Sequence, residues 1–390
     1  MRVLHLVKEF SPPLQTFVYD LVCDLRKEEG ISPAVACYKR RMNERERPFD
    51  PVYDLTRSLP LSTGTFGELG AWIKGLGRRE YRFLRLCEMF RPDVIHAHFA
   101  WSVWDHLLKP YALLKSPLPV IVSTHGTDVL RSLKASPERR DLFVEFVVGN
   151  PVLVSVATNF LKEHLLEIGL PEDRICFIPY ACRADFLGKR GVGRLEGDSS
   201  VFRFISNGRL VEWKGHKFLI EAFGHFCERV NGDAELWIIG EGPLRSSLEA
   251  LGEALGVGER IRFLGWVSHS EVGGLLAKCD LFLQPSIVDV ETGQAEAFGI
   301  SILEAIAVGL PVVVTQTGGM PEVVGGECQH ARIVQEKSAD ALFEAMRQSY
   351  EGRGSTPDNL DYAEERLRRY SPKQRLRKCL SAYRSVIEGG

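Results

Sequence analysis

Short apolar runs rich in β-branched residues alternate along the chain with longer segments in which apolar positions recur at helical spacing. Such alternation is typical of βαβ units, in which helices connect the strands of a parallel sheet. In the first half, strands are predicted at Arg2–Val7, Ala34–Cys37, Asp93–His96, Val120–Ser123, Val152–Val156 and Ile175–Ile178. In the second half, strands are predicted at Phe202–Ser206, Glu235–Ile239, Arg260–Phe263, Leu281–Gln284, Pro311–Thr315 and Ala331–Val334. The pattern therefore predicts an α/β fold with two doubly wound sheets in tandem, whose ligands bind beyond the carboxyl ends of the strands.

Helices are predicted where the apolar positions form one stripe, for example at Thr16–Lys27, Phe66–Phe90, Lys217–Arg229, Leu244–Leu255 and Ser338–Tyr350. A polar, glycine-rich stretch at Gly188–Ser200 interrupts the alternation and is the predicted linker. We therefore expect a first domain over residues 1–190 and a second over residues 201–369. A basic amphipathic helix is predicted at Tyr370–Ile387, within a last segment of residues 370–390.

Composition limits the classes of protein to which the chain can belong. Its 390 residues suit two cores, and 45% hydrophobic with 26% charged residues is ordinary for a globular protein. A net charge of -2 excludes a general nucleic-acid binder, which carries a strong basic excess. The nine cysteines are scattered without a Cys-x-x-Cys pair, so we expect free thiols in a reducing compartment. No apolar run approaches the roughly 18 residues of a membrane span, and a cytoplasmic location is expected.

The segment after the first strand of the second half carries the strongest site signal. It reads N-G-R-L-V-E-W-K-G from Asn207 to Gly215 and leads into a predicted helix. Arg209 and Lys214 would place two cations at the carboxyl end of a strand beside helix amides, while Gly208 lets the backbone approach a ligand. These features suit a diphosphate. The alternative is a solvated basic turn.

Two carboxylates, Glu296 and Glu304, form the second signal. Glu296 lies in the loop after the strand at Leu281–Gln284, and Glu304 lies in a helix predicted to begin near Gly299. A carboxylate that accepts hydrogen bonds from two vicinal hydroxyls is what the recognition of a ribose needs. Because the neighbours of Glu304 are apolar, we expect a buried, partnered carboxylate there rather than an exposed helix residue.

Histidines follow two predicted strands of the first half. His125 comes just after the strand at Val120–Ser123, where a side chain can touch a ligand, although a single histidine is more often structural. His96 and His98 are separated by one alanine and so point to the same side of their strand. No cysteine or carboxylate near them completes a metal site, and we expect no bound metal.

Together these motifs resemble a known family. The two glutamates and three glycine motifs are similar to those of family 4 of the retaining glycosyltransferases: G-R-L-x-x-x-K-G from Gly208, G-x-G-P-L from Gly240, and G-L-P-V-V-x-T-x-x-G-G from Gly309. The resemblance is densest over residues 202–325. It implies the GT-B fold, with two Rossmann-like domains, an active site in the cleft between them and a C-terminal helix that crosses back to the first domain. It also implies transfer of a hexosyl-type sugar from a nucleotide diphosphate sugar to an acceptor hydroxyl, in polysaccharide, glycolipid or glycoconjugate synthesis.

The resemblance implies a role for each candidate residue. Arg209 and Lys214 would hold the diphosphate and offset the charge that develops as it leaves. His125 would contact the donor sugar, Glu296 would meet the transferred sugar and the phosphates, and Glu304 would bind the ribose. The predicted catalytic residues are thus His125, Glu296, Arg209 and Lys214. The predicted donor site also includes Gly208, Phe298, Gly299, Ile300 and Glu304.

The expected mechanism needs neither a metal nor a cofactor. No Asp-x-Asp motif stands at a strand end, and the two cations with a helix N-terminus can stabilise the leaving diphosphate. Front-face attack by the acceptor hydroxyl, assisted by the leaving phosphate, is the preferred retaining route that the resemblance implies. The alternative is Glu296 as a covalent nucleophile.

The first domain departs from the family where the acceptor is expected. Many members carry Gly-Gly after the first strand, but this chain reads S-P-P-L-Q-T-F from Ser11, which resembles members that build exopolysaccharide or lipopolysaccharide. We expect the acceptor against Gln15, Thr16 and His98. The basic amphipathic segment Lys74–Arg91 could lie on an anionic membrane and so favour a lipid-linked acceptor. The alternatives are a helix packed on the sheet and a soluble acceptor.

Other functions stay open at this stage. A sugar-nucleotide epimerase or a phosphorylase on the same fold would use the nucleotide-sugar site without a separate acceptor. A natural-product glycosyltransferase would use a soluble acceptor, and a non-catalytic protein would only bind the nucleotide sugar. A nicotinamide-dependent dehydrogenase is disfavoured, because no G-x-G-x-x-G follows the first strand.

Overall fold

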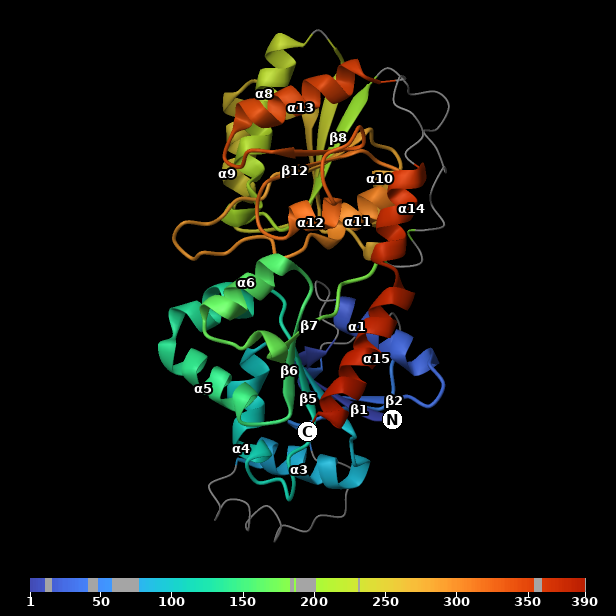
Figure 1. Cartoon of the computed structure of the whole chain (residues 1–390). Coiled ribbons are helices and arrows are strands. Elements are labelled where there is room, and N and C mark those ends of the chain that lie inside the picture. The colour runs from blue at the N-terminus through green and yellow to red at the C-terminus, as the bar shows by residue number, and fades with distance from the viewer. Residues whose placement is uncertain are drawn as a thin grey trace. The chain divides into compact units, whose positions relative to one another are not determined.

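The computed structural model describes residues 1–10, 16–40, 48–57, 77–182, 186, 201–230, 232–353 and 360–389. Two compact units make up the chain (Figure 1). Unit 1 comprises Met1–Tyr180 and Pro372–Gly390, and unit 2 comprises Ala181–Ser371. The predicted linker, Gly188–Ser200, lies outside the described residues, as does the first part of the helix predicted at Phe66–Phe90.

Unit 1 is built on a parallel sheet of seven strands in the order β3-β2-β1-β4-β5-β6-β7. The strands are β1 (Arg2–Phe10), β2 (Ser32–Arg40), β3 (Val52–Asp54), β4 (Val94–His98), β5 (Val120–Ser123), β6 (Val152–Val156) and β7 (Ile175–Phe177). Helices cover the central strands on both faces, which is why these strands read as nearly continuous apolar runs. The predicted strands are confirmed. β3 was not predicted, because three residues are too few to show a period.

The helical segments of unit 1 connect these strands. They are α1 (Thr16–Lys27), α3 (Arg78–Phe90), η1 (Val103–Leu107), α4 (Leu108–Tyr111), η2 (Asp128–Leu133), α5 (Pro137–Val148), α6 (Asn159–Glu167), η3 (Glu172–Arg174) and α15 (Pro372–Glu388). Two of them, η1 and η2, are π-helical turns, which occur often at functional sites.

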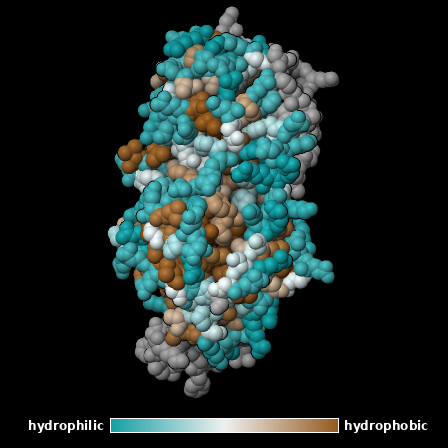
Figure 2. Space-filling view, viewed as in Figure 1, coloured by the Kyte–Doolittle hydropathy of each residue, from teal (hydrophilic) through white to brown (hydrophobic). Residues whose placement is uncertain are grey.

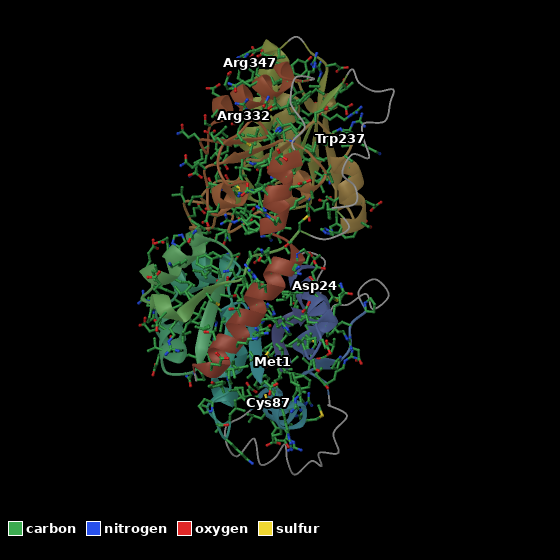
Figure 3. All side chains as sticks on the ribbon, turned by 45° about the vertical axis from the view of Figure 1, so that its right-hand side comes forward. Met1, Asp24, Cys87, Trp237, Arg332 and Arg347 are labelled. Atoms are coloured by element: carbon green, nitrogen blue, oxygen red, sulfur yellow. The ribbon has the colours of Figure 1, made fainter. Side chains whose placement is uncertain are left out.

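The last helix, α15, belongs to unit 1, as the resemblance implied. It packs against α1, β5 and β6, and its Cys379 and Tyr383 are fully buried in that core. Arg375 of α15 donates to the Asp24 carboxylate of α1 over 2.6 Å. Asp24 is labelled on α1 in Figure 3. The Tyr383 hydroxyl lies 2.6 Å from Nδ1 of His96 on β4. Unit 1 is therefore assembled from two parts of the chain that unit 2 separates.

Unit 2 contains a parallel sheet of six strands in the order β10-β9-β8-β11-β12-β13. The strands are β8 (Phe202–Asn207), β9 (Ala234–Ile239), β10 (Ile261–Gly265), β11 (Leu281–Gln284), β12 (Val312–Thr315) and β13 (Ala331–Val334). The helical segments are η4 (Glu212–Lys214), α8 (His216–Arg229), α9 (Arg245–Ala254), η5 (Gly258–Arg260), α10 (His269–Leu276), α11 (Ile300–Ala307), α12 (Met320–Val324), α13 (Ala339–Glu351) and α14 (Leu360–Arg369). Each strand predicted for this half is confirmed.

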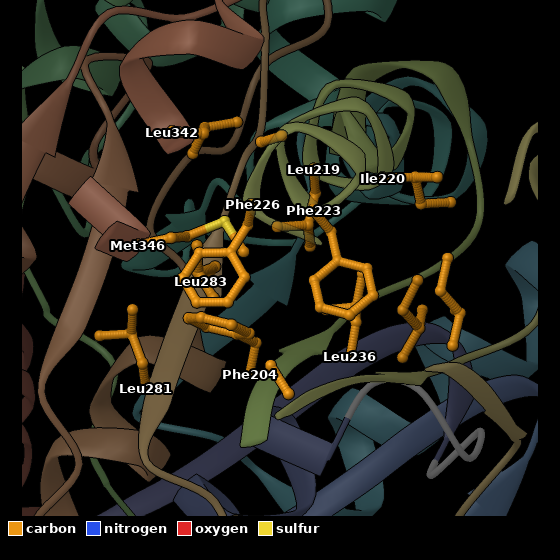
Figure 4. Close-up of a cluster of buried hydrophobic side chains, with 14 of the residues drawn as sticks. Phe204, Leu219, Ile220, Phe223, Phe226, Leu236, Leu281, Leu283, Leu342 and Met346 are labelled. Atoms are coloured by element: carbon orange, nitrogen blue, oxygen red, sulfur yellow. The ribbon is translucent and has the colours of Figure 1, made fainter. Parts of the chain in front are cut away.

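Aromatic and aliphatic side chains of β8, α8 and α13 form the core of unit 2 (Figure 4). Phe204 of β8 lies with its ring centroid 5.0 Å from that of Phe226 on α8, and Phe223 lies one turn earlier on the same apolar stripe. Met346 of α13 is fully buried against them. Burial of each such side chain contributes roughly 1.5–3 kcal/mol to stability, so this core fixes the strand ends that carry the site.

The surface is largely hydrophilic on the face that Figure 2 shows, with apolar patches that are most extensive on unit 1. None of the described helices is long and apolar enough to pass through a bilayer. All nine cysteines are free, and Cys328 is exposed.

Both sheets reverse their strand order at one place, between β1 and β4 in unit 1 and between β8 and β11 in unit 2. Connections leave such a switch point in opposite directions, which opens a ligand-binding crevice beyond the carboxyl ends of the strands. We therefore expect the functional residues in the loops that follow these four strands.

Candidate functional site

An ion pair lies at the switch point of unit 2. The ammonium of Lys214, in the turn after β8, contacts a carboxylate oxygen of Glu296, in the loop after β11. The side chains are only 11% and 12% exposed, although 82 residues separate them in sequence. Two of the predicted site residues are thus brought together, with opposite charges largely shielded from solvent.

Glycine makes this approach of the two loops feasible. Gly215 follows Lys214 with φ of 67°, and a Cβ atom there would lie 1.9 Å from the carbonyl oxygen of Pro285. Beside it, the Ile287 amide donates to the Trp213 carbonyl over 2.9 Å. Any larger residue at position 215 would push the turn that carries Lys214 away from the loop that carries Glu296.

Trp213 lies against both cations of the turn. Its ring centroid is 4.5 Å from the Lys214 ammonium nitrogen and 5.9 Å from the guanidinium carbon of Arg209. Arg209 is exposed, whereas Lys214 is buried. A Cβ atom on Gly208 would lie 3.3 Å from Cδ of Lys214, so a side chain there would crowd the lysine. Gly208, Arg209 and Lys214 therefore form one cationic turn, in which Trp213 orients the charges by cation–π contact.

The glycine pair after β12 holds the backbone of Glu296. The Gly319 amide donates to the Glu296 carbonyl over 2.9 Å. Gly318 has φ of 60°, and a Cβ atom there would lie 2.0 Å from the same oxygen. The last two glycines of the G-L-P-V-V-x-T-x-x-G-G motif thus fix the carboxylate through its main chain.

Glu304 is buried, as predicted, at 5% exposure. It lies in α11, which begins after Gly299 at φ of 89°, and its Oε1 is 3.6 Å from Nε2 of His269. The start of α11 is anchored by the Ser301 hydroxyl, which donates to the buried Gln284 amide oxygen over 3.0 Å. His269 was missed in the sequence, where a polar residue at the start of α10 carries no signal of its own.

The other residues predicted for the donor site stand at the same helix start. Phe298 is buried and meets Tyr370 edge to face at 5.3 Å, and Ile300 is half-buried. The main chain of this segment can present amides of α11 to an anion. Ile300 and Glu304 therefore lie on α11, and Gly299 is the residue that precedes it.

In unit 1, His125 follows β5, and one of its ring nitrogens is hydrogen-bonded. Its Nδ1 is hydrogen-bonded to the Tyr180 hydroxyl, and within the described residues its enclosed Nε2 has no partner. Burial holds the pKa of His125 well below 6.5, so the ring is neutral at physiological pH.

Asp128, which was not predicted as a site residue, ties the loops after β4 and β5 together. Its carboxylate is fully buried and accepts the His125 amide over 3.0 Å and the Ala100 amide over 2.8 Å. Burial raises the pKa of this carboxyl, while the amide hydrogen bonds act in the opposite direction. The position of His125 therefore depends on a carboxylate three residues later in the chain.

Three buried histidines, His5, His96 and His98, lie side by side in the centre of this sheet. One candidate ligand atom of each lies within 4.8 Å of the others, a spacing that could hold a metal ion. Nδ1 of His5 is 3.0 Å from Nε2 of His98. Both nitrogens of His96 are hydrogen-bonded, to the Tyr383 hydroxyl and, over 2.7 Å, to the Ser123 hydroxyl. Nε2 of His5 and Nδ1 of His98 are buried and have no hydrogen-bond partner among the described residues.

Of the three residues predicted for the acceptor side, the structure describes two. Gln15 lies outside the described residues, and Thr16 is the half-buried first residue of α1. His98 is 1% exposed, and its ring lies 5.8 Å from that of His125. The roles predicted for these residues stay predictions.

Two models of known protein families match the sequence of the chain. "Glycosyltransferase Family 4" matches residues 14–184, and "Glycosyl transferases group 1" matches residues 195–367. The chain belongs to the family 4 glycosyltransferases and has the GT-B fold.

Named relatives agree with this class. An uncharacterized glycosyltransferase of Methanocaldococcus jannaschii is 28% identical over 66% of each chain. A GDP-mannose-dependent alpha-(1-6)-phosphatidylinositol monomannoside mannosyltransferase of Mycobacterium tuberculosis is 29% identical over 62% of each. The alignments thus span less than two thirds of these relatives. HepE of Anabaena, solved with UDP and glucose, has a TM-score of 0.75 at 18% identity, over 99% of this chain and all of that one.

Proposed function

We propose that the protein is a retaining glycosyltransferase that moves a hexosyl-type sugar from a nucleotide diphosphate sugar to an acceptor hydroxyl, in polysaccharide or glycolipid synthesis. The observation that carries the proposal is the contact of Lys214 with Glu296 at the switch point of unit 2, in a turn that also carries Arg209 against Trp213. Two cations there match a diphosphate, and the buried Glu304 matches a ribose.

Lys214 is the principal group for departure of the diphosphate. Negative charge grows on the leaving phosphate as the bond to the sugar breaks, and a cation fixed in place stabilises that charge without reorganising. Glu296 keeps Lys214 in position before the donor arrives. Because the Glu296 carboxylate is neutralised by this pair, it suits positioning better than covalent attack on the sugar. The acceptor hydroxyl then attacks from the face that the diphosphate leaves and gives its proton to the departing phosphate.

The test combines binding with product analysis. Among UDP-, GDP-, ADP- and dTDP-sugars, at least one should raise the unfolding midpoint, since a ligand of the native state stabilises it by mass action. With that donor and an acceptor, proton NMR should show retained anomeric configuration, and EDTA should leave the rate unchanged. An inverted product would refute the retaining mechanism. Epimerised donor without acceptor would favour an epimerase, and binding without turnover a non-catalytic protein.

Peripheral contact with an anionic membrane is the second part of the proposal. The apolar side of α3 is buried in unit 1 through Phe83 and Leu86, so it is not available to lipid. Apart from Glu88, the charged residues that α3 and the neighbouring α4 leave exposed are basic, and Met89 and Leu113 are exposed as well. The exposed basic residues here are Arg78, Arg79, Lys109 and Lys115. Such a surface binds anionic headgroups mainly by charge.

Vesicle co-sedimentation tests this contact. We expect binding to vesicles that contain phosphatidylglycerol, loss of binding on vesicles of phosphatidylcholine alone, and weakening as salt rises. Lys109→Glu with Lys115→Glu should reduce binding without changing the unfolding midpoint, because both lysines are exposed. Absence of binding at low salt by the folded protein would leave a soluble acceptor as the better proposal.

A further inference from the structure

One carboxylate oxygen of unit 2 joins the loops that follow three neighbouring strands. Oε2 of Glu336, in the loop between β13 and α13, accepts the Val288 amide over 2.7 Å and the Thr317 hydroxyl over 2.7 Å. Val288 lies in the loop after β11, and Thr317 lies in the loop after β12. Because β11, β12 and β13 are neighbours in a parallel sheet, these loops leave the same edge, and Glu336 connects all three.

The first of these hydrogen bonds fixes the start of the loop after β11. Two consecutive amides of this loop bind to different elements: Ile287 donates to the Trp213 carbonyl over 2.9 Å, and Val288 donates to Glu336. The loop therefore leaves β11 held between the cationic turn and the loop after β13. Two residues further on, Val290 is 84% exposed, so the loop passes into solvent before it returns to the site.

The second hydrogen bond acts on the end of the same loop. Thr317 is buried, and it directly precedes the glycine pair that holds the main chain of Glu296. Its amide donates to the Thr315 carbonyl over 2.8 Å, which turns the chain within three residues. Because its hydroxyl is bound to Glu336, Thr317 sets the place at which the Gly319 amide meets the Glu296 carbonyl. One carboxylate therefore acts on both attachment points of the loop.

Glu336 is itself held between two fixed points of the backbone. Two residues before it, Val334 ends β13, and two residues after it, Ser338 caps α13 by accepting the Ala341 amide over 3.1 Å. Lys337 between them has φ of 57°, a left-handed conformation that persists only where the surrounding structure maintains it. Among the described residues, no lysine or arginine forms an ion pair with Glu336. Its carboxylate, an acceptor of charge-assisted hydrogen bonds, therefore serves the two loops.

We propose that Glu336 is a positioning residue of the donor site, which acts through Val288 and Thr317 to hold Glu296 against Lys214. The proposal rests on the proposed function and deepens it, because it assigns the geometry of the ion pair to a residue outside that pair. A misplacement of about 1 Å at a reacting group can lower a rate about 100-fold. Loss of Glu336 should therefore be visible in kcat.

Hydrogen–deuterium exchange, followed by NMR, tests the attachment without requiring turnover. In Glu336→Ala, the Gly319 amide that donates to Glu296 should exchange about tenfold faster than in the wild type, because local opening becomes easier. Glu327→Ala is the matched control and should leave this exchange unchanged. Glu327 accepts the Ile333 amide of β13 over 3.2 Å, but among the described residues it forms no hydrogen bond to the loops after β11 and β12. Unchanged exchange at Gly319 in Glu336→Ala would overturn the proposal.

Substitutions of Thr317 separate positioning from packing. Thr317→Val keeps the shape of the side chain and removes the hydroxyl, whereas Thr317→Ser keeps the hydroxyl and removes a methyl group. Positioning through Glu336 predicts that Thr317→Val lowers kcat about tenfold with KM for the donor within about threefold, and that Thr317→Ser retains the wild-type kcat. Packing alone predicts the reverse order, and that order would overturn the proposal.

A double variant completes the test. Glu336→Ala/Thr317→Val should have the kcat of Glu336→Ala alone, because both substitutions remove the same link. Additive losses would show that the two residues act independently and would overturn the proposal. Faster exchange at Gly319 in Glu336→Ala, in a protein whose wild type transfers sugar from no nucleotide donor, would support the attachment and refute only the proposed function.

Discussion

Replacing Lys214 with methionine is expected to lower kcat by about 100- to 1,000-fold, the usual effect of removing one fixed group that stabilises transition-state charge. Donor binding should weaken far less, because the charge that Lys214 faces grows only as the diphosphate leaves. Methionine keeps most of the side-chain volume beside Trp213. Steady-state kinetics, with donor affinity from calorimetry, measure the two effects separately. Arg209→Ala should act in the same direction more weakly, since Arg209 is exposed.

The ion pair with Glu296 requires a control for stability. Loss of the ammonium leaves a largely buried carboxylate without its counter-ion, which destabilises the fold. The double variant Lys214→Met/Glu296→Gln should recover the unfolding midpoint but not kcat. Lys217→Met, which removes a 61% exposed lysine from the adjacent helix, should change neither. A Lys214→Met enzyme with only a raised KM would contradict the role in departure of the diphosphate.

Lowering the pH from 7.5 to 5 is expected to destabilise unit 1 by several kcal/mol. Burial holds the pKa of His98 at about 3 and those of His5, His96 and His125 well below 6.5. Below pH 6.5 these histidines bind protons in the unfolded chain but not in the folded protein. Their contribution to the free energy of unfolding is therefore present above that pH and is lost as the pH falls. Each proton that only the unfolded state binds lowers the free energy of unfolding by roughly 1.4 kcal/mol per pH unit.

Urea unfolding between pH 5 and 7.5, followed with calorimetry to separate the transitions of the two units, measures this slope. His5→Phe keeps an aromatic ring in the core but removes one titrating group, so its slope should be shallower than that of the wild type by about one proton. A slope below one proton for unit 1 in the wild type would show that the buried rings accept protons in the folded state.

The sequence was most informative where burial is periodic. α1 has the predicted bounds, because its apolar positions form one stripe that packs on the sheet. The strands of both sheets were recognisable because central parallel strands are apolar on both faces. Placing Arg209, Lys214 and Glu304 near ligand-binding strand ends needed only the rule that parallel strands present their carboxyl ends at one edge.

What the sequence could not indicate are partnerships that depend on strand register and loop path. His5 was passed over because nothing local marks it, and only its register with His96 brings it into the histidine network. The contact of His269 with Glu304 arises from two helices, α10 and α11, that meet in space. The sequence also does not predict the left-handed backbone conformation of Phe99, whose φ is 68°. This conformation is normally inferred from glycine or asparagine.

The position of α15 has a consequence for synthesis of the protein. This helix follows the whole of unit 2 in the chain, yet it closes the core of unit 1 through Cys379 and Tyr383. On the ribosome, where domains usually fold in order of appearance, the first unit would therefore be the last to finish. In the interval, the surface that α15 covers is open to chaperones. A chain that ends before α15 would leave that surface exposed permanently.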